Sequence, residues 1–236
     1  MTIARSAVAF RFQSVIDEIS RLDWDDLLEE QCIDVAWAYY YFSVQFRENL
    51  EIACELLPDD ARLAHLAREE CDTDNLSPWE GVAAEGEKLN HDEFMRRLLL
   101  LAPIDEGRQR EFEALGQVYL AEVRSTDRLT RALSIASYED GGLEQVFRAM
   151  CRMPVVANPA LRAFRHFLLE HIRFDSDPNG GHGALSRHLS PDDRILPLWT
   201  AFRDLLRDFV PGLAATVEWA RRAGAELAVG LPADGS

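Results

Sequence analysis

Apolar residues recur at three- and four-residue spacing through almost the whole chain, while the alternating pattern of a half-buried strand is scarce. Helical spacing places apolar side chains on one face, so the pattern predicts an all-α protein. No low-complexity linker or internal repeat interrupts it, and we expect one helical domain over residues 1–229 with a flexible tail over 230–236. The predicted helices cover residues 6–21, 24–56, 59–72, 88–102, 105–124, 127–139, 142–152, 159–174, 191–209 and 211–228.

Two of these helices begin with clear signals. Asn158 precedes Pro159, a pairing typical of an N-cap followed by proline at the first helical position. Ser190-Pro191-Asp192-Asp193 places two acidic residues where the first turn of the next helix should lie. Both signals support the predicted starts near residues 159 and 191.

One of the predicted helices carries an imidazole and a carboxylate on its apolar face. His171 and Asp175 are four residues apart and therefore share a face. A charged Asp on a buried stripe is costly unless a positive group meets it, and a divalent metal would do so. The alternative is an imidazole–carboxylate pair satisfied inside the core. The apolar residues that precede the pair at helical spacing are Phe164, Phe167 and Leu168.

Three further segments each place one metal-compatible residue on an apolar face. Glu139 interrupts the stripe of positions 129, 132, 136, 139 and 143. His91 begins the apolar face of residues 91–98, and Glu70 continues the inward face of residues 63–70, with Glu69 on the solvent side. Alone, each is more typical of a helix end or a partly exposed polar group. Together with His171 they predict a carboxylate-rich dimetal site inside a helical bundle.

On these residues the chain resembles the haem-oxygenase-like dimetal oxidases, relatives of the TenA and chlamydial CADD proteins. The resemblance covers roughly residues 30 to 210, is strongest from His171 to Leu189, and implies a haem-oxygenase-like (TenA-like) helical bundle. In that superfamily a Glu, a His and a later Glu precede a His-x-x-x-Asp/Glu group that is closely followed by His. The residues to which the resemblance assigns metal-binding and catalytic roles are Glu70, His91, Glu139, His171, Asp175 and His182.

The spacing departs from the superfamily at two places. The last His follows the acidic ligand by seven residues here, although Gly180 and Gly181 would allow the loop to fold back, and Asp177 is the alternative ligand. The first Glu and His are separated by a long segment, residues 71–90. That separation leaves open the alternatives to Glu70, which are Glu69, Glu80, Glu85 and Glu87.

A ferritin-like bundle needs a Glu-x-x-His pair on each of two helices. The sequence contains no Glu-x-x-His. Ferritin-like iron storage is therefore disfavoured, independently of the resemblance.

The resemblance implies an enzyme that uses two Fe(II) ions, with manganese as the other possible metal, and O2 as co-substrate. Its substrate is expected to be a free amino acid in specialised metabolism, oxidised at an unactivated C–H bond by desaturation, cyclisation or hydroxylation. A narrower resemblance, to enzymes of the polyoxin pathway, rests on Asp175-Ser-Asp-Pro-Asn-Gly-Gly-His182-Gly and would make the reaction isoleucine to an azetidine amino acid. An external reductant and a homodimer are the expected partners.

An amino-acid carboxylate needs a cation nearby, and arginines flank the metal motif. Arg165 and Arg187 are the candidate substrate-binding residues, with Arg194 beyond them; ordinary surface arginines are the alternative. Tyr40 belongs to the aromatic run from Trp37 to Phe42. Its phenol is a third candidate for the pocket, and core packing is the alternative.

The formal net charge of −16 argues against a nucleic-acid surface, because a phosphate backbone needs clustered Lys and Arg. No apolar run approaches the length of a membrane span, and the short apolar stretch from Ala7 to Phe12 is broken by Arg11, so we expect no signal peptide. Unpaired spacing predicts reduced thiols in a cytoplasmic protein. The four cysteines are Cys32, Cys54, Cys71 and Cys151.

Two other classes of function remain open. A metal-free enzyme on the same scaffold, like the TenA thiaminases or the PQQ-forming oxidase, is one; a thiaminase needs a cysteine facing the pocket, and Cys151 lies outside the predicted ligand helices. A non-catalytic helical binding protein with a structural His–Asp network is the other. Against it, Glu70, Glu139 and Asp175 would repel one another without a cation.

Overall fold

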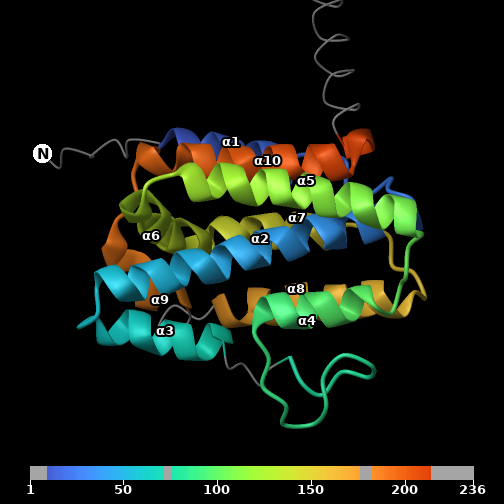
Figure 1. Cartoon of the computed structure of the whole chain (residues 1–236), viewed down its shortest axis with the longest axis horizontal. Coiled ribbons are helices and arrows are strands. Elements are labelled where there is room, and N and C mark those ends of the chain that lie inside the picture. Colours follow the sequence, from blue (N-terminus) through green and yellow to red (C-terminus); the bar gives the residue numbers. More distant parts are fainter. Residues whose placement is uncertain (1–9, 72–75, 176–181, 214–236) are drawn as a thin grey trace, which may run out of the picture.

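The structure, a computed structural model, describes residues 10–71, 76–175 and 182–213. It is all-helical and contains no β-strand within these ranges, which confirms the predicted fold class (Figure 1). The α-helices are α1 (Arg11–Ser20), α2 (Glu29–Leu56), α3 (Ala61–Cys71), α4 (His91–Leu99), α5 (Glu106–Ser125), α6 (Arg128–Ser137), α7 (Leu143–Met150), α8 (Pro159–Asp175), α9 (His182–Ser186) and α10 (Leu196–Phe209).

Helix α2 runs through the middle of the bundle. It packs against α3, α4, α5, α6, α8 and α10, and Figure 1 shows it between a layer of α1, α5 and α10 and a layer of α3, α4, α8 and α9. A helix with neighbours on several sides must bury residues around its circumference. The chain meets this requirement, because Val35, Ala36, Tyr41 and Val44 point in different directions around the helix and all are buried.

Several predicted helix starts are correct because a side chain caps them. Asp105 accepts hydrogen bonds from the backbone N–H groups of Gly107 and Arg108 at the start of α5. Asp127 accepts one from Thr130 at the start of α6, and Asn158 accepts one from Ala160 at the start of α8. Each cap satisfies donors that have no partner inside the helix.

Other predicted bounds are wrong by several residues. Helix α2 begins at Glu29 rather than at residue 24, because the Gln31 side chain accepts the N–H of Leu28 and closes the first turn there. The predicted helix 191–209 starts as a short 3₁₀ turn, Asp193–Ile195, before α10. The predicted helix 211–228 and the 230–236 tail fall almost wholly outside the described residues.

Helices α6 and α7 are joined by a five-residue π-helical turn, Tyr138–Gly142. The sequence pattern predicts two separate helices here, 127–139 and 142–152. The structure confirms the break, because Asp140 and Gly141 leave helical geometry, with Gly141 at a φ of +93°, and the chain kinks between α6 and α7. We call Tyr138–Gly142 the π-turn.

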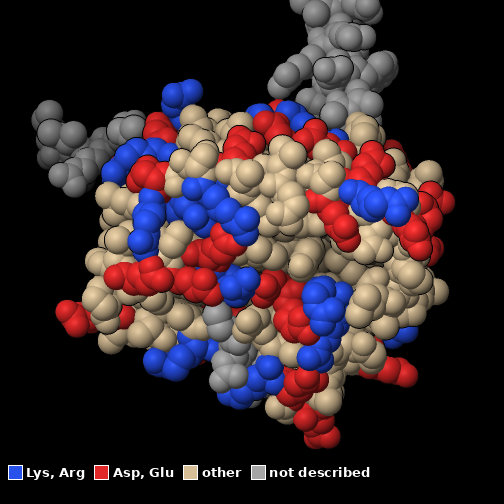
Figure 2. Space-filling model, in the orientation of Figure 1, with Lys and Arg blue, Asp and Glu red and all other residues tan. Residues whose placement is uncertain are grey.

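The surface shown in Figure 2 carries basic and acidic side chains side by side. Ion pairs among the described residues include Arg124–Glu48, Arg148–Glu144 and Arg187–Asp140. No helix in the described ranges has the length and apolar character needed to cross a membrane.

Candidate metal centre

Five of the six predicted ligand residues lie together in the interior. We call Glu70, His91, Glu139, His171 and His182 the metal centre. Glu70 comes from the end of α3, His91 from the start of α4, Glu139 from the π-turn, His171 from α8 and His182 from the start of α9. Four of them are almost fully buried, with exposed fractions of 4 to 7%, and His91 is half-buried. Four separate helices and one turn therefore converge on one point.

Glu70 lies between two sets of donors. Its Oε2 atom is 2.7 Å from Nδ1 of His91, and its Oε1 atom is 2.6 Å from Nδ1 of His182. Nε2 of His171 is 3.2 Å from Nδ1 of His91, and Oε2 of Glu139 is 3.3 Å from Nδ1 of His182. The donors form two groups, Glu70–His91–His171 and Glu70–Glu139–His182, with the ligand atoms in each within 4.8 Å of one another.

The π-turn and α9 meet closely, and this contact delivers two of the ligands. A Cβ atom on Gly183 would lie 2.9 Å from the carbonyl oxygen of Glu139, so any larger residue would push α9 away. His182 precedes this glycine, and its imidazole reaches the Glu139 carboxylate from the other side of the contact. The seven-residue spacing between Asp175 and His182 is thus compatible with His182 reaching the centre.

The ring of His171 is held in one orientation by its own helix. Its Nδ1 atom lies 2.7 Å from the carbonyl oxygen of Phe167, one turn earlier in α8. Because a carbonyl can only accept, Nδ1 carries the proton and Nε2 presents its lone pair toward the centre. A backbone acceptor behind the imidazole is a common feature of metal-binding histidines.

Burial and mutual charge set unusual protonation states when no cation is present. Burial alone would raise the pKa of Glu70, but the charges of His91 and His182 outweigh it and hold that pKa well below its usual range. Burial and the neighbouring Glu70 carboxylate raise the pKa of Glu139. Burial, reinforced by His91, lowers the pKa of His171 to about 3.

The imidazole of His182 shows the opposite shift. Burial disfavours its charge, but the carboxylates of Glu70 and Glu139 outweigh this and raise the pKa of His182 to about 12. Two buried carboxylates therefore hold a proton on this imidazole as their counter-charge. A divalent cation would supply the same counter-charge and release that proton.

One buried oxygen of Glu70 gives a direct test of whether these residues fit a metal. Oε1 makes no hydrogen bond of acceptable geometry to any described residue, although Nδ1 of His182 lies 2.6 Å away. A buried carboxylate oxygen without a partner is costly. Two carboxylates and an imidazole held this close together in the interior suit a shared cation, so the donor set fits a metal.

The space beside the centre is small and mostly apolar. Tyr39, Ser43 and Phe46 line it at helical spacing on α2, with Leu143 from α7, facing the ligands. The cavity measures about 10 Å³, close to the minimum for a single water molecule. Sequence reasoning noted the aromatic run that contains Tyr39 but missed Ser43 and Phe46; their spacing of four and three along the helix was the available signal.

The remaining predicted ligand and its alternatives are placed as follows. Asp175 is the last residue of α8, and its side chain, like Asp177, lies outside the described residues. Glu69 is half-exposed at the rim, with Oε2 at 3.4 Å from Nε2 of His182. Glu87 pairs with Arg97, while Glu80 and Glu85 are exposed. Glu70, rather than these alternatives, has its carboxylate inside the centre.

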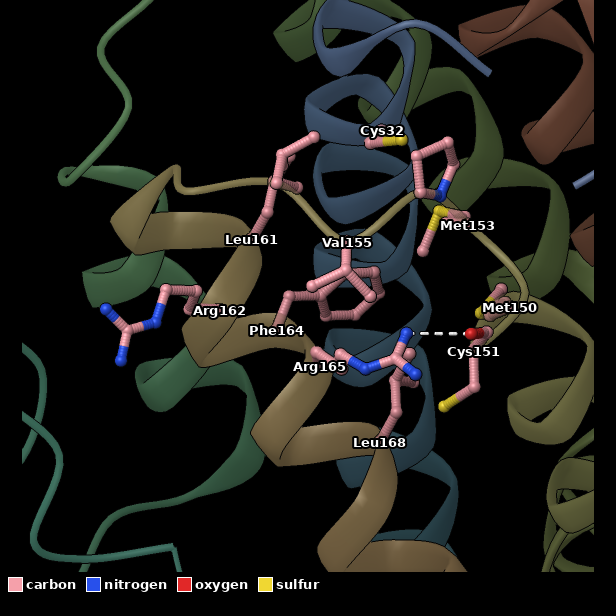
Figure 3. A pocket seen from close by; sticks show the side chains of 12 residues that line it. Cys32, Met150, Cys151, Met153, Val155, Leu161, Arg162, Phe164, Arg165 and Leu168 are labelled. Carbon is pink, nitrogen blue, oxygen red and sulfur yellow. Dashed lines mark hydrogen bonds between the residues drawn. The ribbon is translucent and has the colours of Figure 1, made fainter. Parts of the chain in front are cut away.

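The candidate substrate-binding residues lie outside the lining of this cavity. Arg165 donates to the carbonyl oxygen of Cys151 at 2.7 Å, at the edge of a separate pocket of about 30 Å³ (Figure 3). Arg187 pairs with Asp140 on the surface, and Arg194 pairs with Asp192. Tyr40 is half-buried and contacts Trp37 and Tyr41 rather than the ligands.

The cysteines whose side chains are described do not line the cavity of the metal centre. Cys32 and Cys151 face the separate pocket of Figure 3, and Cys54 contacts the carbonyl of Leu63. Burial raises the pKa of the Cys32 thiol to about 11 and also raises that of Cys151. Raised values keep these thiols protonated and weakly nucleophilic.

Comparison with known proteins leaves the metal centre as the main guide to function. No protein-family model, curated protein or solved structure matches the chain.

Proposed function

We propose that the protein is an O2-dependent dimetal oxidase or oxygenase. The observation that carries the proposal is the position of Glu70, whose two oxygens belong to two separate donor groups. A carboxylate shared in this way can bridge two cations. Because each group adds its own imidazole or carboxylate, the two positions would be occupied together and be chemically distinct.

Iron is the metal that the donors favour, with manganese second. Glu70, His91 and His171 form a two-histidine, one-carboxylate set, which is typical of non-haem Fe(II) oxygenases. Glu70, Glu139 and His182 form a set richer in carboxylate, which suits iron and manganese better than zinc. No described cysteine joins either group, so the thiolate donors that copper(I) and many structural zinc sites use are missing from the described part of the centre.

The chain's own residues would hold the metals, orient them and keep water out. When bound, two such metals supply the reduction of O2 and the removal of hydrogen from an unactivated C–H bond. Tyr39, Phe46 and Leu143 form an apolar wall opposite the ligands, which limits the water on the reacting side to about one molecule. The hydrogen bond to the Phe167 carbonyl fixes the ring orientation of His171 and keeps its proton on Nδ1.

We extend the proposal to the fold and the substrate class. The ligands follow the chain order Glu70, His91, Glu139, His171 and His182 that the resemblance to haem-oxygenase-like dimetal oxidases implies, on an all-α bundle. On this basis we propose that fold. The substrate would be a free amino acid, with isoleucine the first to test, and an external donor would supply reducing equivalents.

The test is an anaerobic Fe(II) titration followed by rapid mixing with O2, with and without a panel of amino acids. We expect two irons per chain and a transient visible absorption that forms faster with one amino acid. Product analysis by mass spectrometry then identifies the reaction. Failure to bind iron would overturn the proposal, and the same titration with Mn(II) and Zn(II) would show whether another metal replaces it.

The small cavity favours a second candidate. A space of about 10 Å³ beside the ligands admits water or a diatomic gas but not an amino acid without rearrangement. A metal-binding protein that reacts with O2 and takes no organic substrate would need no larger space. Iron oxidation at a rate that no amino acid in the panel changes would favour this candidate over the oxygenase.

A further inference from the structure

His182 is flanked by two consecutive carboxylates of α3. Its Nδ1 atom lies 2.6 Å from Oε1 of Glu70, and its Nε2 atom lies 3.4 Å from Oε2 of Glu69. Neighbouring residues on a helix point about 100° apart, so only one of the two can face the interior. Glu70 faces inward and Glu69 stays at the rim, yet both reach the same imidazole from opposite sides.

The imidazoles of His171 and His182 differ in which part of the protein contacts the ring nitrogen that points away from the centre. His171 lies in the last turns of α8, and the carbonyl one turn earlier, that of Phe167, accepts from its outer nitrogen. His182 is the first residue of α9, a helix of only five residues, so no earlier turn of its own helix is available to play this part. Among the described residues, a group that orients His182 has to come from another element.

Glu69 is placed to be that group. Its Oε2 atom faces His182, while its Oε1 atom lies 3.2 Å from Nε2 of His65, one turn earlier on α3. The side chain of Glu69 is 35% exposed and that of His65 is 48% exposed. The contact with His65 holds the Glu69 carboxylate in position from the solvent side, so its second oxygen stays directed at His182.

We propose that Glu69 is a positioning residue: once Nδ1 of His182 binds a metal, Glu69 accepts a hydrogen bond from the outer nitrogen of the ring, which lies 3.4 Å away in this structure, and so sets the metal affinity of the Glu70–Glu139–His182 position. The inference rests on the dimetal function proposed above. With Nδ1 bound to a metal, the proton of the neutral ring resides on Nε2, which is the atom that faces Glu69. A carboxylate behind the ring fixes its orientation and raises its basicity as a ligand. The position formed by His91 and His171 has no contact with Glu69 among the described residues, so it should not respond.

The test is a Co(II) titration of the intact protein, followed by calorimetry and by visible absorption, which needs no turnover. In Glu69→Ala we expect the second Co(II) to bind about 10- to 100-fold more weakly, the usual effect of losing such a partner, and the first to bind as in the wild type. Glu69→Gln keeps an acceptor oxygen and should recover most of the affinity. Glu85→Ala removes one exposed negative charge elsewhere and should bind both ions normally.

Binding of the second Co(II) to Glu69→Ala with wild-type affinity would overturn the inference. Equal weakening of both positions would also overturn it, because it would show that Glu69 merely supports α3. In a Glu139→Ala background, where one ion should remain, adding Glu69→Ala should change nothing. If the wild type binds no metal, the dimetal proposal fails; if it binds two and Glu69→Ala binds two equally well, only the present inference fails.

Discussion

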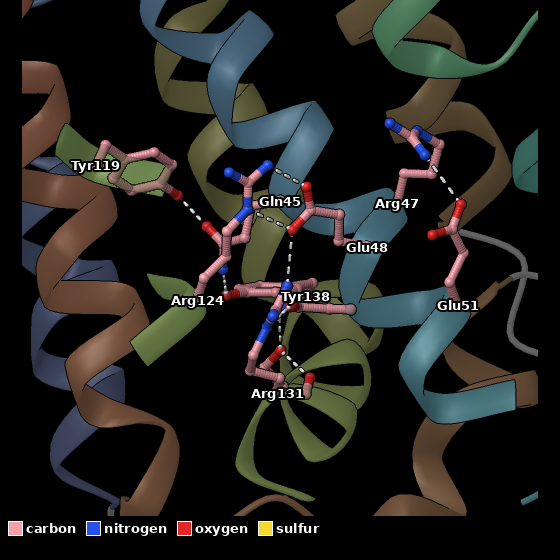
Figure 4. A network of polar contacts seen from close by, with 10 residues as sticks. Gln45, Arg47, Glu48, Glu51, Tyr119, Arg124, Arg131 and Tyr138 are labelled. Carbon is pink, nitrogen blue, oxygen red and sulfur yellow. Dashed lines mark hydrogen bonds and ion pairs between the residues drawn. The ribbon is translucent and has the colours of Figure 1, made fainter. Parts of the chain in front are cut away.

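Two groups of buried polar side chains lie side by side in this bundle, and they differ in how far their hydrogen bonds are completed within the protein. One is the metal centre. The other, which we call the polar bridge, consists of Gln45, Asn49, Tyr119, Arg131, Ser134 and Tyr138 (Figure 4). The groups touch at Tyr138 and Glu139, consecutive residues of the π-turn.

The polar bridge closes its hydrogen bonds within the protein. Tyr119 donates to Gln45, which donates in turn to the Tyr138 hydroxyl at 2.9 Å. Arg131 donates to Asn49 at 2.7 Å and to the Glu48 carboxylate at 3.0 Å, and Arg124 pairs with the same carboxylate. The amides and hydroxyls hydrogen-bond to one another, and two arginines share the Glu48 carboxylate, so the group needs no ligand.

The metal centre does not complete itself. One Glu70 oxygen lacks a hydrogen bond of acceptable geometry to any described residue, and the imidazoles of His91 and His182 offset its charge. A buried carboxylate oxygen without a hydrogen bond calls for an explanation such as a bound ion. The comparison teaches that buried polar groups alone do not indicate a binding site, whereas a buried carboxylate without a full set of hydrogen bonds does.

Glu70→Ala should have the largest effect, because it should remove metal binding while leaving the polar bridge unchanged. It removes the only residue shared by both donor groups, so we expect loss of both metal ions under conditions where the wild type holds two. Activity should disappear with them. Metal content after Fe(II) loading and desalting is the measurement, with exposed Glu85→Ala as the matched variant. Retention of one ion would show that the two groups do not depend on a shared carboxylate.

Glu139→Gln should separate the two donor groups. We expect one ion to remain, at Glu70–His91–His171, while the other is lost. The metal-free variant should gain stability of about 1 kcal/mol, or roughly 2–4 °C in Tm, because a buried carboxylate beside Glu70 becomes neutral. Metal stoichiometry and thermal unfolding of the metal-free protein check both. A lower Tm would mean that the Glu139 charge supports the metal-free fold.

Gln45→Leu should damage the polar bridge and leave the metal centre intact. It removes the partner that the buried hydroxyls of Tyr119 and Tyr138 share. Leaving such groups unsatisfied costs about 2–3 kcal/mol, or roughly 5–10 °C in Tm. Thermal unfolding measures the cost, and Fe(II) titration should still give the wild-type stoichiometry. Loss of iron in a folded Gln45→Leu protein would show that the two groups act as one network.

The smallest effect is a pH dependence carried by Glu48, whose carboxylate pairs with Arg131 of the polar bridge. Burial raises its pKa, but hydrogen bonds and charge from Arg124 and Arg131 outweigh this and lower the pKa below the ordinary 4.5. A carboxyl with a lowered folded-state pKa stabilises the fold above its unfolded-state value, and this stabilisation is lost as the pH falls through the folded-state value.

The wild type should therefore lose stability below about pH 4.5 more steeply than Glu48→Gln does. Urea unfolding of both proteins between about pH 3.5 and 6 measures the difference in slope. Parallel slopes would indicate that the ion pairs of Glu48 contribute nothing in solution, as many surface pairs do.

Much of the fold follows from local pattern. The periodicity of apolar residues predicted the α-helices that the structure describes, apart from α9, and the capping residues Asp105, Asp127 and Asn158 mark starts that the structure reproduces within a few residues. Periodicity and capping are properties of a few adjacent residues, so the sequence alone carries them. The starts of α2 and α10 were misplaced because side-chain contacts and 3₁₀ geometry, rather than pattern, decide where those helices begin.

The ligand types were also readable, because a Glu or His on an apolar stripe stands out in the sequence. Five of the six predicted ligands converge, and Asp175 stays a prediction. Helical spacing had already placed Glu70 on the inward face of α3 and Glu69 on the solvent side, and the structure has Glu70 inside the centre with Glu69 at its rim. The π-turn, the close contact at Gly183 and the cavity wall from α2 are contacts between distant segments. Such contacts depend on how whole helices pack, and no local pattern encodes them.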